Sequence, residues 1–368
     1  MRLSLRWRFM VAALAVVLVA LAYHLYVGRL ARRVGESLVI YTYESLLRWG
    51  KDPEAVWDRV FYEFGRRHGC NVTVVTFSDA GTMLRALIEE REEPRADVVI
   101  GIDNILVFQA KKWGVLEPYT PSNIGDLRPE LVEALDPEHY VVPYDYGLIA
   151  FVYDSERVDA AVMEALSFES FYNPPLASLL VVEDPTTSST GASFLLWQIA
   201  YYRGVLGRDW REWWRRVAPY VKVVPSWGEA YDIFLNEAAG RPIVVSYGTD
   251  PAYSLYFYNS TRYAATLVYR GGKAYAWLQV EGIGLVRGAR NPELAKAFIE
   301  WFLSPEVQEL IPLNQWMYPA NREVKLPDVY RAAIDPYAVE LLNEYLSPEE
   351  IAANLERWLE EWREAVAG

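Results

Sequence analysis

The sequence predicts an α/β protein, because strand-like and helix-like runs alternate along the chain after an apolar N-terminal segment. Of its 368 residues, 52% are hydrophobic and 23% are charged, which is the composition of a folded chain with a large core. About 330 residues follow the N-terminal segment. This is more than one core usually organises, so we expect two lobes.

The first 36 residues indicate export from the cytoplasm. Three arginines within the first eight residues precede the apolar run Phe9–Val27. As a helix this run would be about 28 Å long, close to the thickness of the hydrocarbon layer. The positive flank predicts a cytoplasmic N-terminus and an extracytoplasmic body. A signal peptide cleaved near Ala20–Ala22 is the alternative. Because the run continues past that point, we predict an uncleaved transmembrane anchor, with residues 28–36 as a linker.

The first part of the body is predicted to be a βαβαβ unit that continues into a third helix. The expected elements are strand Ser37–Tyr43, helix Val56–Arg67, strand Asn71–Phe77, helix Gly81–Glu90, strand Asp97–Ile102 and helix Ile105–Lys112. The long apolar run Val141–Tyr153 follows, and we expect it to pass from one lobe to the other.

A second α/β unit is expected further along the chain. Its elements are strand Leu179–Glu183, helix Ser193–Tyr202, helix Trp227–Glu237 and strand Pro242–Ser246. Strands over Ala274–Val286, helix Pro292–Leu303 and a helix that begins at Ser304 come next. The capping box from Ser347 to Glu350 opens the last helix, Pro348–Val366, whose Trp358 we expect at the surface.

Short loops join strand ends to helices, and open α/β sheets bind ligands at such loops. These loops carry hydroxyl, carboxylate and aromatic side chains; they are Tyr43–Ser45, Ser78–Gly81, Asp103–Asn104, Thr186–Ala192 and Tyr247–Asp250. We therefore expect them to form a binding site.

Two of these loops precede helices in ways that admit two interpretations. The hydroxyl-rich stretch Asp184–Ala192 leads into a helix whose free N–H groups and dipole favour an anion such as phosphate. Ordinary capping would need only one Ser or Thr there. Asp79 also precedes a helix, where a cap is as good an explanation as a ligand contact. The small residues Ala80 and Gly81 would let a ligand approach the backbone.

Aromatic residues in three segments predict a site for an organic cation. Trp227 lies in the capping box from Ser226 to Glu229, Tyr247 ends a strand, and Trp316 lies in an aromatic loop. With Tyr43, these rings would form a cage, since aromatic π faces attract delocalised cations. Core packing is the alternative for Trp316. The net charge of −18 after residue 36 argues against nucleic acid. It also suits a cation, although solubility alone is the better explanation of the overall balance.

Several other site types are disfavoured by the sequence. The one cysteine, Cys70, excludes a disulfide within the chain, and we expect it to be a buried structural thiol. The spacings typical of zinc, P-loop and dinucleotide sites are absent from the sequence. Adjacent tyrosines bind ferric ion in some binding proteins, but Tyr201 and Tyr202 fall in a helical apolar run, which favours core packing.

Seven segments in order resemble the thiamine-binding proteins of ABC importers, within the type II periplasmic binding-protein superfamily. They are VIYTYES, ADVVIGIDN, VPYDYG with FVYD, EDPTTSSTG with LLW, SWGEAYDIFL, VVSYGTDPAY and IPLNQWMYP. The likeness runs from Val39 to near the C-terminus.

The resemblance implies a two-lobed fold whose cleft closes around a ligand. Residues 37–146 plus 265–368 would form lobe 1 and residues 147–264 lobe 2, after the N-terminal segment 1–36. The ligand would be thiamine, thiamine monophosphate or thiamine pyrophosphate. The partner would be an ABC-importer permease, and the protein would be a monomeric binding protein without cofactor, metal or enzymatic activity.

The family's ligand contacts can be carried over position by position. They fall on Asp79, Ala80, Ser188, Ser189, Trp227, Tyr247, Gly248, Thr249 and Asp250, with Tyr43 and Trp316 as cleft aromatics. Asp103 or Asp145 would add charge complementarity. Ala80 stands where the family has Gly, and Asp250 where it has Ser, which leaves the phosphorylation state of the ligand open.

Two other functions remain open at this point. One is a binding protein of the same fold for a polyamine or ferric iron. The other is a thiaminase-like transferase, which would need a cysteine nucleophile. Cys70 precedes a strand, at the opposite end from the predicted cleft, which disfavours that role.

Overall fold

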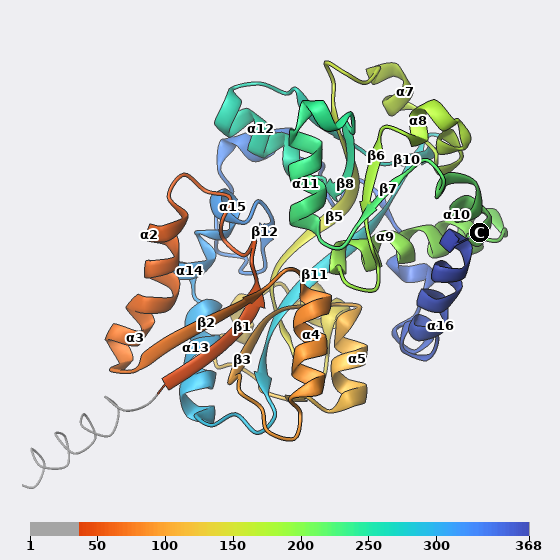
Figure 1. Cartoon of the computed structure of the whole chain (residues 1–368). Coiled ribbons are helices and arrows are strands. Elements are labelled where there is room, and N and C mark those ends of the chain that lie inside the picture. Colours follow the sequence, from red (N-terminus) through yellow and green to blue (C-terminus); the bar gives the residue numbers. More distant parts are fainter. Residues whose placement is uncertain (1–36, 368) are drawn as a thin grey trace, which may run out of the picture.

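The structure is a computed structural model that describes residues 37–367, and it is built around one 13-stranded mixed sheet (Figure 1). The order along the main path of the sheet is β2-β1-β3-β11-β5-β8-β6-β7. The strands are β1 (Ser37–Tyr43), β2 (Asn71–Phe77), β3 (Val98–Asp103), β4 (Leu116–Glu117), β5 (Val142–Asp154), β6 (Leu180–Glu183), β7 (Lys222–Val224), β8 (Ile243–Tyr247), β9 (Tyr263–Thr266), β10 (Val268–Arg270), β11 (Lys273–Val286), β12 (Tyr318–Pro319) and β13 (Glu340–Leu341).

Helices surround this sheet and connect its strands (Figure 1). The α-helices are α2 (Pro53–Trp57), α3 (Glu63–His68), α4 (Ala80–Glu89), α5 (Leu106–Trp113), α6 (Pro129–Leu135), α7 (Ala160–Glu164), α8 (Pro174–Ala177), α9 (Ser189–Ala200), α10 (Arg211–Val217), α11 (Trp227–Leu235), α12 (Asp250–Tyr258), α13 (Pro292–Phe302), α14 (Pro305–Gln308), α15 (Ile311–Asn314) and α16 (Pro348–Ala367). Shorter π and 3-10 turns are η1 (Asp58–Tyr62), η2 (Ile124–Asp126), η3 (Phe168–Tyr172), η4 (Tyr201–Leu206), η5 (Glu237–Ala239), η6 (Asp328–Ala332) and η7 (Leu342–Tyr345).

Two long strands, β5 and β11, connect the halves of the molecule (Figure 1). They pair antiparallel from Trp277 opposite Ile149 to Ile283 opposite Val142. The second half of β11 pairs with β3, whereas the second half of β5 pairs with β8. Parallel strands β2-β1-β3 therefore lie on one side of this pair and parallel strands β8-β6-β7 on the other.

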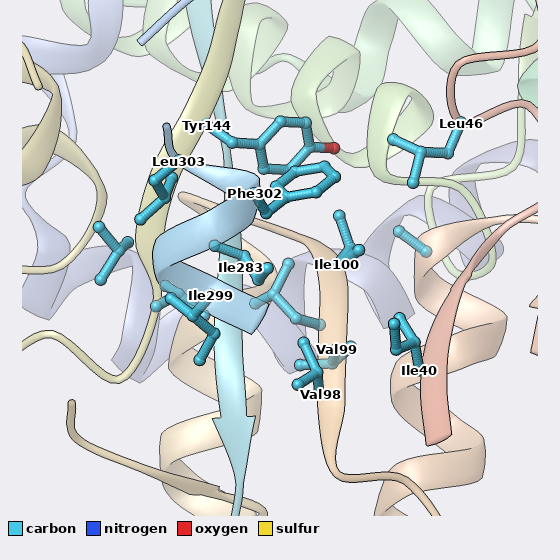
Figure 2. Close-up of a cluster of buried hydrophobic side chains, with 14 of the residues drawn as sticks. Ile40, Leu46, Val98, Val99, Ile100, Tyr144, Ile283, Ile299, Phe302 and Leu303 are labelled. Atoms are coloured by element: carbon cyan, nitrogen blue, oxygen red, sulfur yellow. The ribbon is translucent and has the colours of Figure 1, made fainter. Parts of the chain in front are cut away.

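Each side of the sheet has its own hydrophobic core. Figure 2 shows part of the first core, where side chains from β1, β3, β5 and β11 meet α13; labelled among them are Ile40, Ile100, Tyr144, Ile283 and Phe302. The second core is packed with rings, including Phe151, Trp197 and Trp213, all fully buried. A smaller third cluster, which includes Val152 and Phe234, lies in the second half of the molecule. Two large cores joined by two strands are the basis for a two-lobed molecule.

The C-terminal helix α16 packs with the second core. Leu355, Trp358 and Trp362 are buried there, and the Trp362 ring lies 5.6 Å from that of Trp214 on α10. The expectation that Trp358 is at the surface was wrong, because it lies on the inner face of this amphipathic helix and is 1% exposed. The helix thus contacts residues of the 147–264 segment, whereas the sequence grouped it with lobe 1. The lobe boundaries themselves stay a prediction.

The structure bears out most of the expected elements. β1 and β2 have the predicted bounds, and the run expected over 141–153 is the single strand β5, shifted by one residue to 142–154. The segment 274–286 is one strand, β11, where several were expected. The main element missed is α12, because Asp250-Pro251 was interpreted as a turn. Proline is also well tolerated in the first turn of a helix, and that is where Pro251 lies.

The predicted anchor, Phe9–Val27, lies outside the described residues. From residue 37 to residue 367, the structure contains no helix with both the length and the apolar character needed to cross a bilayer.

Replacing Trp358 with alanine should destabilise the protein by about 3–5 kcal/mol, because it leaves a cavity beneath α16. Urea unfolding followed by circular dichroism measures the change. Trp113→Ala, at a ring that is 44% exposed, is the matched control and should change the free energy of unfolding by about 0.5 kcal/mol or less. Equal losses of unfolding free energy in the two variants would contradict the burial of Trp358 beneath α16.

Candidate ligand-binding site

A cavity lies at the carboxyl ends of β1, β2, β6, β7 and β8, where the loops that lead into α4, α9, α11 and α12 converge. The space between its walls, including the part that is open to solvent, is about 610 Å³. Seven of the eleven predicted site residues line it: Tyr43, Asp79, Ser189, Trp227, Tyr247, Asp250 and Trp316. The structure thus brings together loops from five strand ends, as expected for an open α/β sheet. The loop after β3 is not among them.

The other four predicted residues lie outside the lining. Ala80 is fully buried in the first core. Ser188 caps α9, since its Oγ accepts a hydrogen bond from the Gly191 N–H at 3.3 Å. Thr249 is fully buried, and the buried Gly248 is tied by its backbone to Leu148 and Ile334. These residues support the wall of the cavity.

Asp79 is the central polar residue of the site, and it serves three helices at once. Its Oδ1 accepts hydrogen bonds from the N–H groups of Ala80 at 2.8 Å and Ser189 at 3.0 Å. Its Oδ2 accepts one from the Trp227 N–H at 3.1 Å. These donors are the first residues of α4, α9 and α11, whose positive ends favour a carboxylate. Burial raises the pKa of Asp79, and the three N–H groups oppose that rise.

Gly81 allows α4 to approach the loop before α9. A Cβ at this position would lie 2.4 Å from the carbonyl oxygen of Thr187, closer than two such atoms can come. Gly81 therefore makes room for Thr187, whereas the sequence suggested room for a ligand. This close contact brings the first turn of α4 within reach of α9, so that Asp79 can bond to Ser189.

Aromatic side chains form much of the wall. Trp227 stacks on Tyr231 with ring centroids 4.9 Å apart, and its Nε1 donates to Ser246 Oγ at 3.1 Å. Trp49, from the loop after β1, meets Trp227 edge-on at 5.2 Å and so joins the first half of the sheet to α11. Tyr253 of α12 meets Trp316 edge-on at 5.4 Å. These faces and edges are suited to a flat cationic ligand.

Trp316 is held in an unusual backbone conformation. Its φ is 59°, in the left-handed region that a bulky residue rarely adopts. Its Nε1 donates to the carbonyl oxygen of Trp49 at 2.9 Å, and its ring stacks parallel to that of Tyr330. These contacts stabilise the strained conformation and fix the ring against the cavity.

The floor of the cavity is acidic and is built on β11. The carboxylate of Glu281 accepts hydrogen bonds from the hydroxyls of Tyr43 at 2.9 Å and Tyr144 at 3.0 Å. Gln315 donates to the Tyr43 hydroxyl at 2.7 Å. Burial raises the pKa of Glu281 to about 7, although the two tyrosine hydroxyls favour its ionised form. Gly101 on β3 has a φ of 109° and leaves space for the Tyr43 ring.

Further buried carboxyls lie around this floor. Burial raises the pKa of Asp250 to about 7 and that of Asp145 well above its usual range. Asp145 lies behind the lining. Asp103, also behind it, caps α5 and accepts a hydrogen bond from Gln279 at 3.0 Å, and burial raises its pKa to about 7. The carboxyls are held mostly without basic partners, which suits a site that receives a positive charge.

Sequence reasoning missed eight lining residues: Ser45, Trp49, Ser78, Thr190, Tyr231, Tyr253, Glu281 and Gln315. Ser45, Ser78, Thr190 and Gln315 stand in loops that had been singled out. Glu281 could have been identified from the sequence, because a charged residue within an apolar strand needs a partner or has a function. The sequence around Trp49, Tyr231 and Tyr253 is typical of residues that pack in a core.

The type II periplasmic binding proteins share this architecture. It consists of a mixed sheet with two main cores, two connecting strands and a site at the strand ends between the cores. The family model described as "Bacterial extracellular solute-binding protein" matches residues 50–309, and the chain belongs to this family.

The chain is also similar to individual proteins over most of its length. It is 33% identical to the thiamine-binding periplasmic protein of Brucella abortus, covering 92% of this chain and 94% of that protein. The protein of the same name from Escherichia coli K12 is 31% identical, with 90% and 93% covered. A solved structure, "Periplasmic thiamin binding protein", superimposes with a TM-score of 0.76 at 30% identity, covering 90% of this chain and 96% of that one. These matches confirm the resemblance seen in the sequence.

Asp79→Asn should destabilise the protein by about 1–3 kcal/mol, because an amide offers one acceptor oxygen where the carboxylate offers two. Thermal and urea unfolding would measure the loss. Asp52→Asn is the control: Asp52 caps the exposed start of α2 through one hydrogen bond to Ala55, and Asn is an equally good cap. Equal stability in the two variants would contradict the shared role of Asp79.

Proposed function

We propose that the protein is an extracytoplasmic solute-binding protein that captures thiamine and delivers it to the permease of an ABC importer. One observation carries the proposal. Among residues 37–367, those lining the cavity include seven aromatic side chains and three carboxyls but no Lys or Arg. Thiamine joins an aromatic pyrimidine to a positively charged thiazolium, which suits such a lining.

The rings and carboxyls have separate roles in this proposal. Trp49, Trp227 and Trp316 cover the flat faces of the ligand, and exclusion of water strengthens their attraction for its charge. Asp250 and Glu281 supply the opposite charge. Ser189 and Thr190 lie near the start of α9, where they can contact the hydroxyethyl end. The similarity to thiamine-binding relatives supports the choice of thiamine among organic cations.

Ferric iron is less well supported as the ligand. Tyr201 and Tyr202 lie away from the cavity lining, and both pack against Phe168 at centroid distances of 5.3 and 6.0 Å. In the part of the chain that the structure describes, no three His, Cys, Asp or Glu side chains come together as a metal site would require. A polyamine stays the alternative cation, and the absence of a cofactor and of a metal stays a prediction.

A transferase function is also less well supported. Cys70 comes directly before β2, at the end of that strand opposite the loop that enters the cavity, and it is outside the lining. The absence of enzymatic activity remains a prediction.

The location and partners follow from the proposed role. The periplasmic relatives support an extracytoplasmic body. The N-terminal segment supports either a transmembrane anchor over 9–27 or a cleaved signal peptide, and we propose the anchor because the apolar run continues past the candidate cleavage site at residues 20–22. The permease partner and the monomeric state are part of the same proposal.

Titration calorimetry with thiamine tests this function directly, and an absence of heat together with an unchanged melting temperature would refute it. Trp227→Ala should weaken binding by about 2- to 30-fold, the size of one cation–π contact. Trp113→Ala removes an exposed ring remote from the cavity lining and should leave the affinity unchanged.

The affinity for thiamine should rise with pH. Because the pKa values of Asp250 and Glu281 are about 7, both carboxyls are mostly neutral at pH 6 and mostly ionised at pH 8. A bound cation favours the ionised forms, so affinity should increase about tenfold over this range for each carboxyl involved. Tyr43, Tyr144, Asp145 and Asp103 face Glu281, and none of them brings a positive charge.

Calorimetry at several pH values measures this rise. Glu281→Gln should reduce the rise by about tenfold and leave the part due to Asp250, whereas Glu117→Gln, at an exposed side chain of β4, should leave the profile unchanged. A profile independent of pH in the unmodified protein would exclude carboxyl ionisation as part of binding.

A further inference from the structure

We infer that the protein has a second small-molecule site, a groove over the strands that connect its two halves, which takes an organic cation with an aromatic body. The inference goes beyond the proposed function and does not depend on which ligand the cleft takes. Among residues 37–367, no residue lines both this groove and the cavity described above. The two sites are therefore distinct.

The groove lies where the two main cores meet. Phe108 of α5 and Leu278 of β11 line it, and each of these side chains packs against both cores. Leu131 of α6, from the first core, and Ile351 of α16, from the second, also line it. The space between its walls, including the part that is open to solvent, is about 1150 Å³. This is room for an aromatic ring with an alkyl chain.

The walls of the groove are fixed by bonds between the two halves. The backbone N–H of Leu278 donates to Asn343 Oδ1 at 2.8 Å, and its carbonyl oxygen accepts from Asn343 Nδ2 at 2.9 Å and Asn104 Nδ2 at 3.1 Å. Helices α5 and α16 lie next to each other at this side of the molecule (Figure 1), joined by an ion pair of Lys112 with Glu356 at 2.7 Å. A groove held in this way is formed before a ligand arrives, which lowers the entropy lost on binding.

The floor of the groove is aromatic and holds an unused donor. Trp277 of β11 and Tyr146 of β5 line it, and both are almost fully buried. The Trp277 Nε1 has no hydrogen-bond partner in the part of the chain that the structure describes. A buried indole N–H usually finds a partner, and the face of an aromatic ring accepts a weak hydrogen bond from an N–H group. The floor therefore favours a ligand with an aromatic body.

The rim of the groove is acidic. Glu130 and Glu133 of α6 and Glu344 of η7 line it with exposed side chains, and the lining contains no Lys, Arg or His. Within residues 37–367, none of these three carboxylates forms an ion pair. The Tyr337 hydroxyl donates to Glu130 at 3.4 Å, and its ring is 65% exposed at this rim. The rim thus attracts a positive charge and repels a negative one.

Floor and rim together define the class of ligand. An arylalkylammonium ion places its ring on Trp277 and Tyr146 and its ammonium group among the carboxylates of the rim. Exposed charge pairs are weak one by one, so the selectivity for a cation comes from several carboxylates acting on the same group. An aromatic anion would gain the same contacts with the floor and be repelled at the rim.

The test is titration calorimetry of the protein with 4-phenylbutylammonium and with 4-phenylbutyrate at pH 7.5. The two probes share their aromatic body and differ in the sign of their charge. We expect the ammonium ion to bind about tenfold or more tightly than the carboxylate. Absence of heat with the ammonium ion, or equal affinity for the two probes, would overturn the inference.

Two variants place the bound probe. Ala134→Trp adds a ring at an exposed position of the groove lining, so it should remove one equivalent of ammonium binding and leave binding of thiamine unchanged. Trp227→Ala, in the cleft, should leave that equivalent in place. The opposite pattern, loss in Trp227→Ala and retention in Ala134→Trp, would assign the probe to the cleft and overturn the inference.

A charge reversal at the rim keeps the test independent of the added ring. Glu133→Lys, at an exposed side chain, should weaken the ammonium ion and strengthen the carboxylate, so that their affinity ratio falls about tenfold or more. Glu117→Lys, at an exposed side chain outside the groove, is the control and should leave the ratio unchanged. An equal change of the ratio in both variants would show a general effect of net charge and count against the site.

Discussion

The carboxylate of Asp79 is the constraint on which the geometry of the cleft depends. Three helices from both halves of the molecule begin at this one side chain, and each contributes an N–H group that would otherwise lack a partner in a buried place. Only a short side chain with two acceptor oxygens can serve helices that converge from different directions. The contact also depends on Gly81, since any larger residue would keep Thr187 away. The positions of Ser189 and Trp227 at the cavity follow from it.

The acidic floor illustrates a trade between stability and binding. Glu281 and Asp250 are buried carboxyls whose ionisation is disfavoured by the surrounding protein, so at neutral pH they reduce the stability of the fold when no cation is present. Tyrosine hydroxyls offset part of this cost at Glu281, because Tyr43 and Tyr144 donate to it. A hydrophobic residue in either place would pack more favourably, yet it would remove the charge that a cation needs.

The sequence predicted the class of fold and the edge of the sheet that holds the site, because strand ends such as Tyr43 and Tyr247 are legible from local patterns. Some of its errors come from contacts between residues distant along the chain, and others from local geometry, such as Asp250-Pro251 starting a helix where a turn was expected. The residues next to Trp49 in the sequence do not indicate that its ring contacts Trp227. Ser188 and Ser189 differ only in the direction of their side chains at the start of α9, where Ser188 caps the helix and Ser189 lines the cavity. Asp79 was judged equally suited to capping or binding, and it caps three helices while also lining the cavity.

The Asp79 hydrogen bonds also affect how fast a ligand can enter and leave. They join Ala80 in one half to Ser189 and Trp227 in the other through protein groups alone, so they favour the closed conformation even in an empty molecule. A larger closed fraction lowers the conformational cost of binding and tightens the apparent affinity. The same bonds must break before the cleft opens, which slows both association and release. One buried carboxylate thus adds to the barrier that a ligand meets at this cleft as well as fixing the shape of its site.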